Sequence, residues 1–224
     1  MPSQPYSKLL LLPLFQGMSN DDLTLLVGRT KLDFRKAAPQ TIIAKADESC
    51  QQLLFLLDGE VQVEGAAQNK HYIITETMHA PIAIQPERLF GLEQQYSRTF
   101  TATTPCNILS ISKQEVLRLL EEHMIFRFNL LNITAACVHR HERRLWQLPV
   151  GDLGQRITRF ITARCIRPAG EKHIRIKMND LAMELGCSRL EVSKALHKLQ
   201  DEGLLSISRN FIHIQHLEQL LKHF

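Results

Sequence analysis

The sequence lacks long apolar runs and closely spaced cysteines. Its longest apolar stretch, residues 9–15, has seven residues and includes Pro13, far short of the roughly 20 residues that span a membrane. Nothing basic precedes a long apolar segment at the N-terminus, so we expect no secretory signal. The five cysteines include no C-x-x-C pair, which argues against a disulfide framework and a cysteine-only zinc or iron–sulfur site. We therefore predict a cytoplasmic protein that does not interact with a membrane.

The balance of charge differs along the chain. Residues 1–149 contain 15 Lys plus Arg and 15 Asp plus Glu, whereas residues 150–224 contain 12 and 8. The net charge of +4 therefore arises entirely from the last third of the chain. A basic region of this kind is the first feature expected of a domain that binds nucleic acid.

The first zone, residues 1–112, has the pattern of an antiparallel β-barrel or sandwich. It begins with a short helix for which Ser19 and Asp22 are placed as a capping box. Short alternating or apolar runs follow, split by Pro, Gly, Asp and Asn at a spacing of roughly ten residues. These predicted strands are KLDFRK, QTIIAKA, CQQLLFLLDGEVQVEG, KHYIITETM, RTFTATTP and NILSIS.

The second zone, residues 113–148, predicts one long helix. Its 36 residues contain no Gly or Pro, and a helix of this length spans about 50 Å. Six positions at steps of three and four form a heptad seam whose expected partner is a second copy of the helix. The alternative is that the stripe packs on its own barrel, which we expect only for residues 116–120. The seam consists of Phe128, Leu131, Ala135, Val138, Glu142 and Leu145.

The third zone, residues 149–224, predicts a helix-turn-helix followed by a hairpin. Residues 149–152, PVGD, form a plausible hinge before a helix over 153–165. Ala182, Gly186 and Val192 have the spacing at which a small residue allows close helix approach, a Gly forms the turn and a branched residue anchors the second helix. Ser188 and Glu191 form a capping box that starts this second helix, about 188–202. The first helix has Lys177 where a Ser or Thr cap is usual.

The second helix carries polar side chains that suit DNA recognition. Arg and Lys donate to guanine O6 and N7, and Ser pairs with a base or a phosphate. The N-terminal part of such a helix enters the major groove, and its N-terminus attracts a phosphate. The alternative is a helical hairpin with a solvated basic face. The predicted DNA-binding residues are Ser188, Arg189, Leu190, Ser193, Lys194, Lys198 and Arg209.

Nearly the whole chain resembles the Crp/Fnr family of bacterial transcription regulators. The resemblance lies in LLFLLDGEVQVE and TATTPCNILSISKQEVLRLL in the barrel, and in GCSR and LQDEGLLSIS in the third zone. It implies an α+β fold with a cyclic-nucleotide-binding-like jelly-roll barrel over 1–112, a dimerisation helix over 113–148 and a winged helix-turn-helix over 149–224. It also implies a homodimer on a palindromic site in double-stranded DNA, a signal perceived at the barrel or the dimer helices, and RNA polymerase as a partner. Leu190 departs from the family, because a Glu is common at that position.

The resemblance also allows the family's cyclic-nucleotide-binding residues to be compared with this sequence. In family members that bind one, a cassette of Gly-Glu and then Arg-Ser or Arg-Thr holds the cyclic phosphate. Here no Glu follows Gly91, and the phosphate-binding Arg aligns with Tyr96 and its hydroxyl neighbour with Ser97. Arg98 stands two residues later and is expected to face the same side of a strand. Cyclic AMP is therefore disfavoured. The candidate effector residues are Gly91, Tyr96, Ser97, Arg98, His141 and Glu142, the last two by alignment with nucleotide contacts on the long helix.

Three interpretations of the sensor stay open: an unidentified small effector at the junction of barrel and long helix, a haem, or no ligand. The run HAPIAIQPERLFG loosely resembles haem-binding sensors of gases or nitrosative stress, and the candidate axial ligands are His71, His79, His123, His139 and His141. The scattered cysteines exclude the branch with an iron–sulfur cluster. The H-x-H at 139–141 falls in the helical zone, where its side chains diverge. We therefore expect no metal site, no catalytic residues and no enzyme activity.

Overall fold

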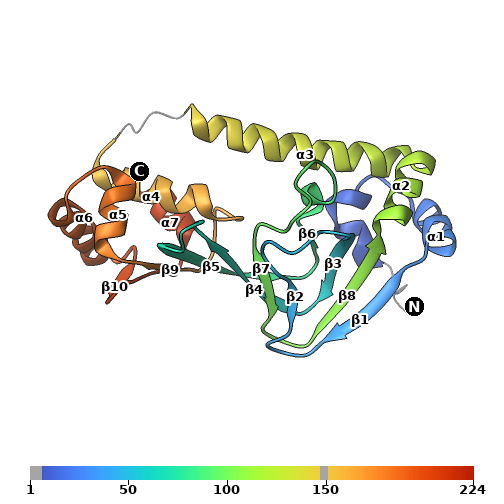
Figure 1. The fold of residues 1–224 in the computed structure, drawn as a ribbon, viewed down its shortest axis with the longest axis horizontal. Coiled ribbons are helices and arrows are strands. Elements are labelled where there is room, and N and C mark those ends of the chain that lie inside the picture. The colour runs from blue at the N-terminus through green and yellow to red at the C-terminus, as the bar shows by residue number, and fades with distance from the viewer. Residues whose placement is uncertain (1–6, 147–150) are drawn as a thin grey trace. The chain divides into compact units, whose positions relative to one another are not determined.

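The computed structural model describes residues 7–146 and 151–224 and divides into two compact units (Figure 1). The first unit runs to Val61 and resumes over Met78–Arg143. The second unit combines Gln62–Thr77 with the chain from Arg144 to Phe224. The predicted zones 1–112 and 149–224 thus differ from the units by one segment, because residues 62–77 belong with the C-terminal part.

The first unit is an antiparallel β-sandwich with helices at both of its chain ends. One sheet has the strand order β1-β8-β3-β6, and β2 pairs antiparallel with β7. Every predicted strand run forms a strand, which confirms the barrel or sandwich predicted for this zone. The elements are η1 (Ser7–Leu11), η2 (Pro13–Phe15), α1 (Asn20–Arg29), β1 (Asp33–Ala37), β2 (Ile42–Ala44), β3 (Gln52–Asp58), β6 (Ile82–Ile84), η3 (Pro86–Arg88), β7 (Thr99–Ala102), β8 (Cys106–Ser112), α2 (Lys113–Glu122) and α3 (Met124–Leu145). Strand β4 (Glu60–Ala66) begins in this unit, and its residues from Gln62 onward belong to the second.

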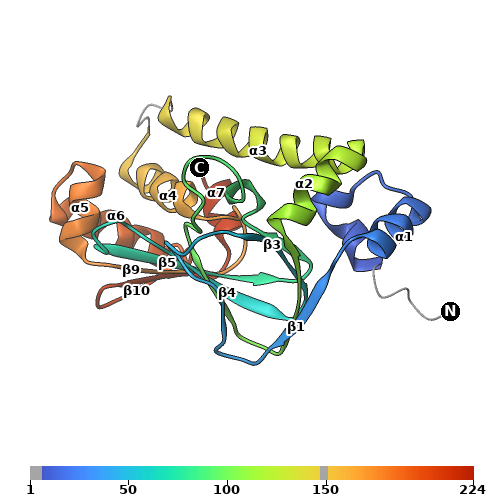
Figure 2. The same ribbon diagram turned by 45° about the vertical axis from the view of Figure 1, so that its right-hand side comes forward.

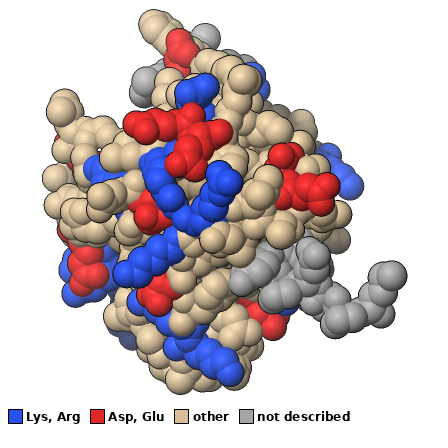
Figure 3. Space-filling view, turned by 90° about the vertical axis from the view of Figure 1, so that its right-hand side faces the viewer, with Lys and Arg blue, Asp and Glu red and all other residues tan. Residues whose placement is uncertain are grey.

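Aromatic side chains from three distant segments form the centre of this unit. The ring of Phe15 lies 5.6 Å from that of Phe55 in β3 and 5.5 Å from that of Phe126 in α3, centroid to centroid. All three are fully buried. The apolar run at residues 9–15 thus forms two short 3-10 helices that pack into the core. On the face toward α1 and β1, basic and acidic side chains are interspersed (Figure 3), in keeping with the equal numbers of each over residues 1–149.

The helical predictions in this unit are confirmed at one place and wrong at another. Ser19 and Asp22 form the predicted capping box of α1. The single helix predicted over 113–148 is wrong, because His123 has φ −121° and ψ 100° and separates α2 from α3. The break contains neither Gly nor Pro, and it lets each helix bury its own apolar residues in the unit. These are Val116 and Leu119 in α2 and Phe126 and Leu130 in α3.

Within the described residues, the second unit packs four helices and five hydrogen-bonded strands around one core (Figures 1 and 2). Its strands are hydrogen-bonded in the order β10-β11-β9-β5-β4. The buried isoleucines of β9 alternate with exposed residues, and the isoleucines of β5, β9 and β11 pack against apolar side chains of all four helices. The further elements are β5 (Tyr72–His79), α4 (Leu153–Arg164), β9 (Lys172–Ile176), α5 (Met178–Leu185), α6 (Arg189–Asp201), β10 (Ser206–Ser208), β11 (Phe211–Ile214) and α7 (Leu217–Lys222).

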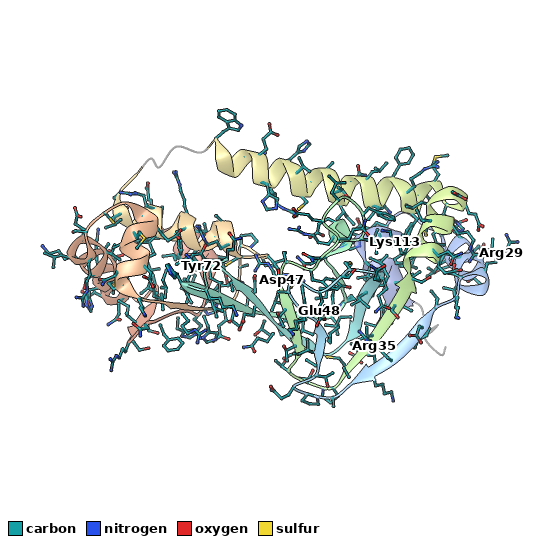
Figure 4. The ribbon with its side chains drawn as sticks, viewed as in Figure 1. Arg29, Arg35, Asp47, Glu48, Tyr72 and Lys113 are labelled. Atoms are coloured by element: carbon teal, nitrogen blue, oxygen red, sulfur yellow. The ribbon has the colours of Figure 1, made fainter. Side chains whose placement is uncertain are left out.

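Strand β5 joins this unit through one buried ion pair as well as through its pairing with β9. The Glu76 carboxylate accepts a hydrogen bond from Lys172 Nζ at 3.0 Å, and both side chains are almost fully buried. The same carboxylate accepts from the backbone N–H groups of Ile166 and Arg167, at 2.7 and 3.3 Å. At the other end of β5, Tyr72 (Figure 4) accepts from Arg164 Nε at 2.7 Å. The segment of residues 62–77, which joins β4 to β5, is therefore built into the second unit.

Candidate nucleic-acid interface

Helix α6 begins at a fully formed capping box. The Ser188 hydroxyl oxygen accepts the backbone N–H of Glu191 at 3.2 Å, and the Ser188 backbone N–H donates to the Glu191 carboxylate at 2.8 Å. The side-chain and backbone hydrogen bonds from Ser188 lower the pKa of the Glu191 carboxyl. The prediction of this box is confirmed, and it fixes which residues occupy the first turn of the helix.

The turn before α6 has the geometry that its sequence predicts. Gly186 adopts φ 59° and ψ 43°, a left-handed conformation that Gly reaches at little cost. The Gly186 N–H donates to the carbonyls of Ala182 and Met183, and the Cys187 N–H donates to Ala182 at 3.1 Å. Lys177 makes no side-chain cap at the start of α5, also as predicted. This tight turn sets the angle between α5 and α6.

Burial divides α6 into an anchoring face and an exposed face. Val192, Leu196 and Leu199 are buried in the core of the unit. Among the predicted DNA-binding residues of the helix, Arg189, Leu190, Lys194 and Lys198 are exposed, and Ser193 is half-buried.

His197 extends the exposed face of α6 and was missed by the sequence reasoning. It is exposed and follows Ser193 by four positions, which places the two on the same side of a helix. That spacing is the signal that identifies it.

The hairpin of β10 and β11 places Arg209 beside the start of α6. Its turn consists of Arg209 and Asn210, and Asn210 adopts a positive φ of 64°. Arg209 is exposed. Arg189 and Arg209 both line a surface hollow of about 200 Å³. The structure thus brings together two predicted DNA-binding residues from different elements.

Polar contacts from α4 hold α5, the first helix of the helix-turn-helix, in place. The Arg156 guanidinium donates to the carbonyl of Leu185, the last residue of α5. Arg164 forms an ion pair with Glu184 at 3.0 Å and stacks over Phe160 at 3.9 Å from the ring centroid. These contacts tie the turn of the helix-turn-helix to α4. They support the position of α6 without using any of its exposed residues.

The candidate effector residues of the barrel form a loop with its own internal contacts. Tyr96 is buried, and its hydroxyl donates to the Gln52 carbonyl at 3.4 Å. Burial, with the neighbouring Cys50, raises the pKa of the Tyr96 phenol, which therefore stays neutral. Ser97 is exposed, and its hydroxyl accepts from Gln85 Nε2 at 2.6 Å. Tyr96 thus supplies no charge to a cyclic phosphate.

Two further features of this loop differ from the simple expectation. Strand β7 begins at Thr99, so Tyr96 and Arg98 do not share one side of a strand, and that prediction is wrong. Arg98 is half-buried. Gly91 is exposed with φ 105°, and its carbonyl accepts from Gln94 Nε2 at 2.7 Å. Gln94 in turn accepts from Lys113 at 2.5 Å (Figure 4), which links the loop to the first residue of α2.

The histidines considered as haem ligands lie in polar surroundings. The Nδ1 atom of His71 is 3.1 Å from the Asn69 amide nitrogen, and the Nδ1 atom of His79 is 3.1 Å from a Glu60 carboxylate oxygen. Both of these histidines are exposed, as are His139 and His141, while His123 is half-buried at the break between α2 and α3. The predicted effector residues His141 and Glu142 both lie exposed on α3.

The predicted dimer seam is an exposed apolar stripe on α3. Phe128, Leu131 and Val138 are 53%, 57% and 57% exposed, and Ala135 is exposed between them. The opposite side of α3 contacts the unit through Phe126, Leu130 and Asn129, which donates to the Leu14 and Gln16 carbonyls. Leu145 ends the helix, and its side chain lies outside the described residues, as do Pro149 and Val150 of the predicted hinge. Across the described residues, no helix has the length and apolarity needed to cross a membrane.

Two domain families match the chain. Residues 155–223 match the Crp-like helix-turn-helix domain, and residues 34–123 match the cyclic nucleotide-binding domain. The chain is 24% identical over 183 residues to the cAMP-activated global transcriptional regulator Vfr of Pseudomonas aeruginosa, covering 77% of this chain and 84% of Vfr.

Two solved structures share the fold. The catabolite activator protein of Thermus thermophilus is 19% identical, with a TM-score of 0.54 over 94% of this chain and 97% of that chain. The sensor domain of the transcriptional regulator DNR from Pseudomonas aeruginosa is 18% identical, with a TM-score of 0.52 over 65% of this chain and 95% of that chain.

Proposed function

Because the chain belongs to the Crp/Fnr family of DNA-binding transcription regulators, we propose that it binds a palindromic operator as a homodimer, with α6 in the major groove. One observation carries this proposal. Helix α6 is capped at Ser188, anchored by buried Val192 and Leu196, and exposes Arg189, Leu190 and Lys194 at its N-terminal end. The N-terminal turns of a recognition helix are the part that contacts base edges.

Each predicted DNA-binding residue of α6 has a role that follows from its chemistry. Arg189 and Lys194 donate to guanine, and Ser193 pairs with a base or a phosphate. Leu190 accepts no hydrogen bond, so it reads a thymine methyl where a Glu would read cytosine. The Ser188 turn and Lys198 contact phosphates along the groove. Arg209, in the hairpin of β10 and β11, contacts the DNA phosphate backbone beside α6, since it lines the same surface hollow as Arg189.

The homodimer forms through α3. Its seam positions expose large apolar side chains, whereas the opposite side of the helix is buried in its own unit. A second copy covers this stripe in the manner of a coiled coil. Glu142 occupies a seam position and is exposed, and a polar residue there sets the register of the two helices. From its role as a regulator of this family, we also infer that the protein contacts RNA polymerase and is located in the cytoplasm.

The barrel responds to a small effector at its junction with the long helix, and that effector is not cyclic AMP. Vfr is named as cAMP-activated, but here a buried, neutral Tyr96 aligns with the family's phosphate-binding Arg. Haem and a sensor without a ligand are the alternatives. An absorption spectrum and a native mass spectrum of the freshly purified protein separate the three, through a haem band, an added small mass or neither.

The operator is tested by binding-site selection with the full chain. We expect a palindrome whose half-sites lie about one helical turn, ~34 Å, apart. Affinity should fall steeply with salt, since phosphate contacts release counterions. Selection of only non-palindromic or unrelated sequences would contradict the proposal.

A further inference from the structure

Three side chains that can each ligate a metal ion lie together on the exposed face of the second unit's sheet. His173 of β9 and His213 of β11 are direct partners in the antiparallel register. Glu171 precedes His173 by two positions. Lys172, which lies between them, and Ile174, which follows His173, are both buried. Alternation along the chain therefore puts Glu171 and His173 on one face, where the register adds His213.

The ligand atoms of these side chains converge. His213 Nε2 lies 2.7 Å from Glu171 Oε1, and His173 Nε2 lies 3.4 Å from the same oxygen. The two imidazole rings are stacked, with centroids 4.6 Å apart and planes 13° apart. The two ring nitrogens and the carboxylate oxygen all lie within 4.8 Å of one another. Ligands at about 2.0–2.2 Å from a tetrahedral zinc ion are themselves about 3.3 Å apart. The three ligand atoms are therefore near the required spacing, and the two rings must turn out of their stack to aim both Nε2 lone pairs at one ion.

The backbone that carries these groups is fixed from beneath. Lys172, between Glu171 and His173, is buried and bonded to Glu76 and to the Ala169 carbonyl, at 3.0 and 2.9 Å. Ile212 and Ile214, on either side of His213, are buried in the core of the unit. Sites on strands held in this way keep their ligands in position better than sites on loops; His173 and His213 lie on such strands, and Glu171 directly precedes β9. The three side chains remain between 39% and 52% exposed, so an ion reaches them from solvent.

We propose that Glu171, His173 and His213 bind a divalent transition metal ion of the zinc class. Two imidazoles and one carboxylate are a known donor set for zinc and leave a fourth position for water. An ion pair between Glu171 and the histidines accounts for the contacts without a metal, but it uses the same two Nε2 atoms that a metal would engage. The site cross-links β9 to β11 and places positive charge on the DNA-binding unit. It does not depend on how α6 reads DNA.

The test is zinc binding by the full chain, freed of metal by a chelator and measured by calorimetry. We expect one Zn²⁺ per chain to bind at this site. The variants His173→Ala and His213→Ala should each weaken that binding by about tenfold or more, and Glu171→Gln should also weaken it. Far-ultraviolet circular dichroism verifies that each variant is folded.

His216→Ala is the matched control, because His216 is also an exposed histidine beside a glutamate, at 3.4 Å from Glu218. It should leave zinc affinity unchanged. Added Zn²⁺ should raise the melting temperature of the wild type and of this control, since binding to the folded state alone stabilises it, but not that of His173→Ala or His213→Ala. Equal affinity in all variants, or no zinc binding by the wild type, would overturn the proposal.

Discussion

At the residue scale, Arg189 and Lys194 are the basic residues at the N-terminal end of α6. Both are exposed within its first two turns. Arg189→Ala and Lys194→Ala should each weaken specific DNA binding by ~1–3 kcal/mol and relax preference at one base pair of each half-site. Lys222→Ala, in the exposed part of α7, is the control and should change neither. Competition with substituted operators measures both effects.

The salt dependence of binding separates base readout from phosphate contact. A residue that contacts only a phosphate weakens binding to all sequences alike and lowers the slope of log affinity against log salt by about one unit. If Arg189→Ala and Lys194→Ala both behave in this way, neither residue reads a base.

Leu190 is the most exposed apolar residue on α6, at 65%. Leu190→Glu introduces a carboxylate that accepts from cytosine N4. We expect the selected operator to shift toward a C·G pair at the position that Leu190 faces, with the rest of the site unchanged. Leu190→Met is the control, because it keeps an apolar side chain. An unchanged operator in the Glu variant would mean that residue 190 lies outside the groove.

At the element scale, α3 has one face buried in its own unit and one apolar face exposed. Leu131→Asp combined with Val138→Asp places like charges opposite each other in the proposed seam. We expect the double variant to sediment as a monomer with an intact barrel, and to bind the palindrome weakly. Asn132→Asp combined with Ala136→Asp adds acidic residues to exposed positions outside the seam and should remain a dimer. A dimeric double variant at the seam would show that another surface pairs the chains.

Local sequence signals predicted those elements that local chemistry determines. The capping boxes at Ser19 and Ser188 and the left-handed turn at Gly186 depend on residues within a few positions of each other, and all three are confirmed. Apart from β6, the strands of the first unit were predicted from alternation and turn residues for the same reason. The predicted DNA-binding residues of α6 are on its exposed face because the positions of Val192 and Leu196 fix its buried face.

Features that arise from distant contacts were not predicted. The break at His123 has no Gly or Pro signal and reflects what α2 and α3 each bury. Strand β6 was missed, and it is defined by its pairing with β3, about 28 positions earlier in the chain. His173 and His213 are brought together by the register of β9 and β11, which sequence spacing does not reveal. The effector residues and the seam remain predictions.

At the scale of the whole molecule, the DNA-binding unit is not a continuous stretch of chain. Residues 62–77 come from the barrel zone of the sequence and complete its sheet. Glu76 and Lys172 join the two segments through an ion pair whose side chains are 0% and 2% exposed. Removing one member of such a pair leaves an uncompensated charge in the interior, which is strongly destabilising.

Glu76→Gln should therefore lower the free energy of unfolding of the second unit by about 3 kcal/mol. Glu64→Gln, in the exposed part of β4, is the control and should have little effect. Adding Lys172→Met to Glu76→Gln removes the orphaned charge and should recover part of the loss, since buried pairs are often replaced by apolar residues at little cost. Amide hydrogen exchange measures where the effect falls. We expect faster exchange in β9 and β11 and unchanged exchange in β3 and β8, because those strands belong to the other unit. If exchange became faster only in β3 and β8, or in no strand, residues 62–77 would not stabilise the DNA-binding unit.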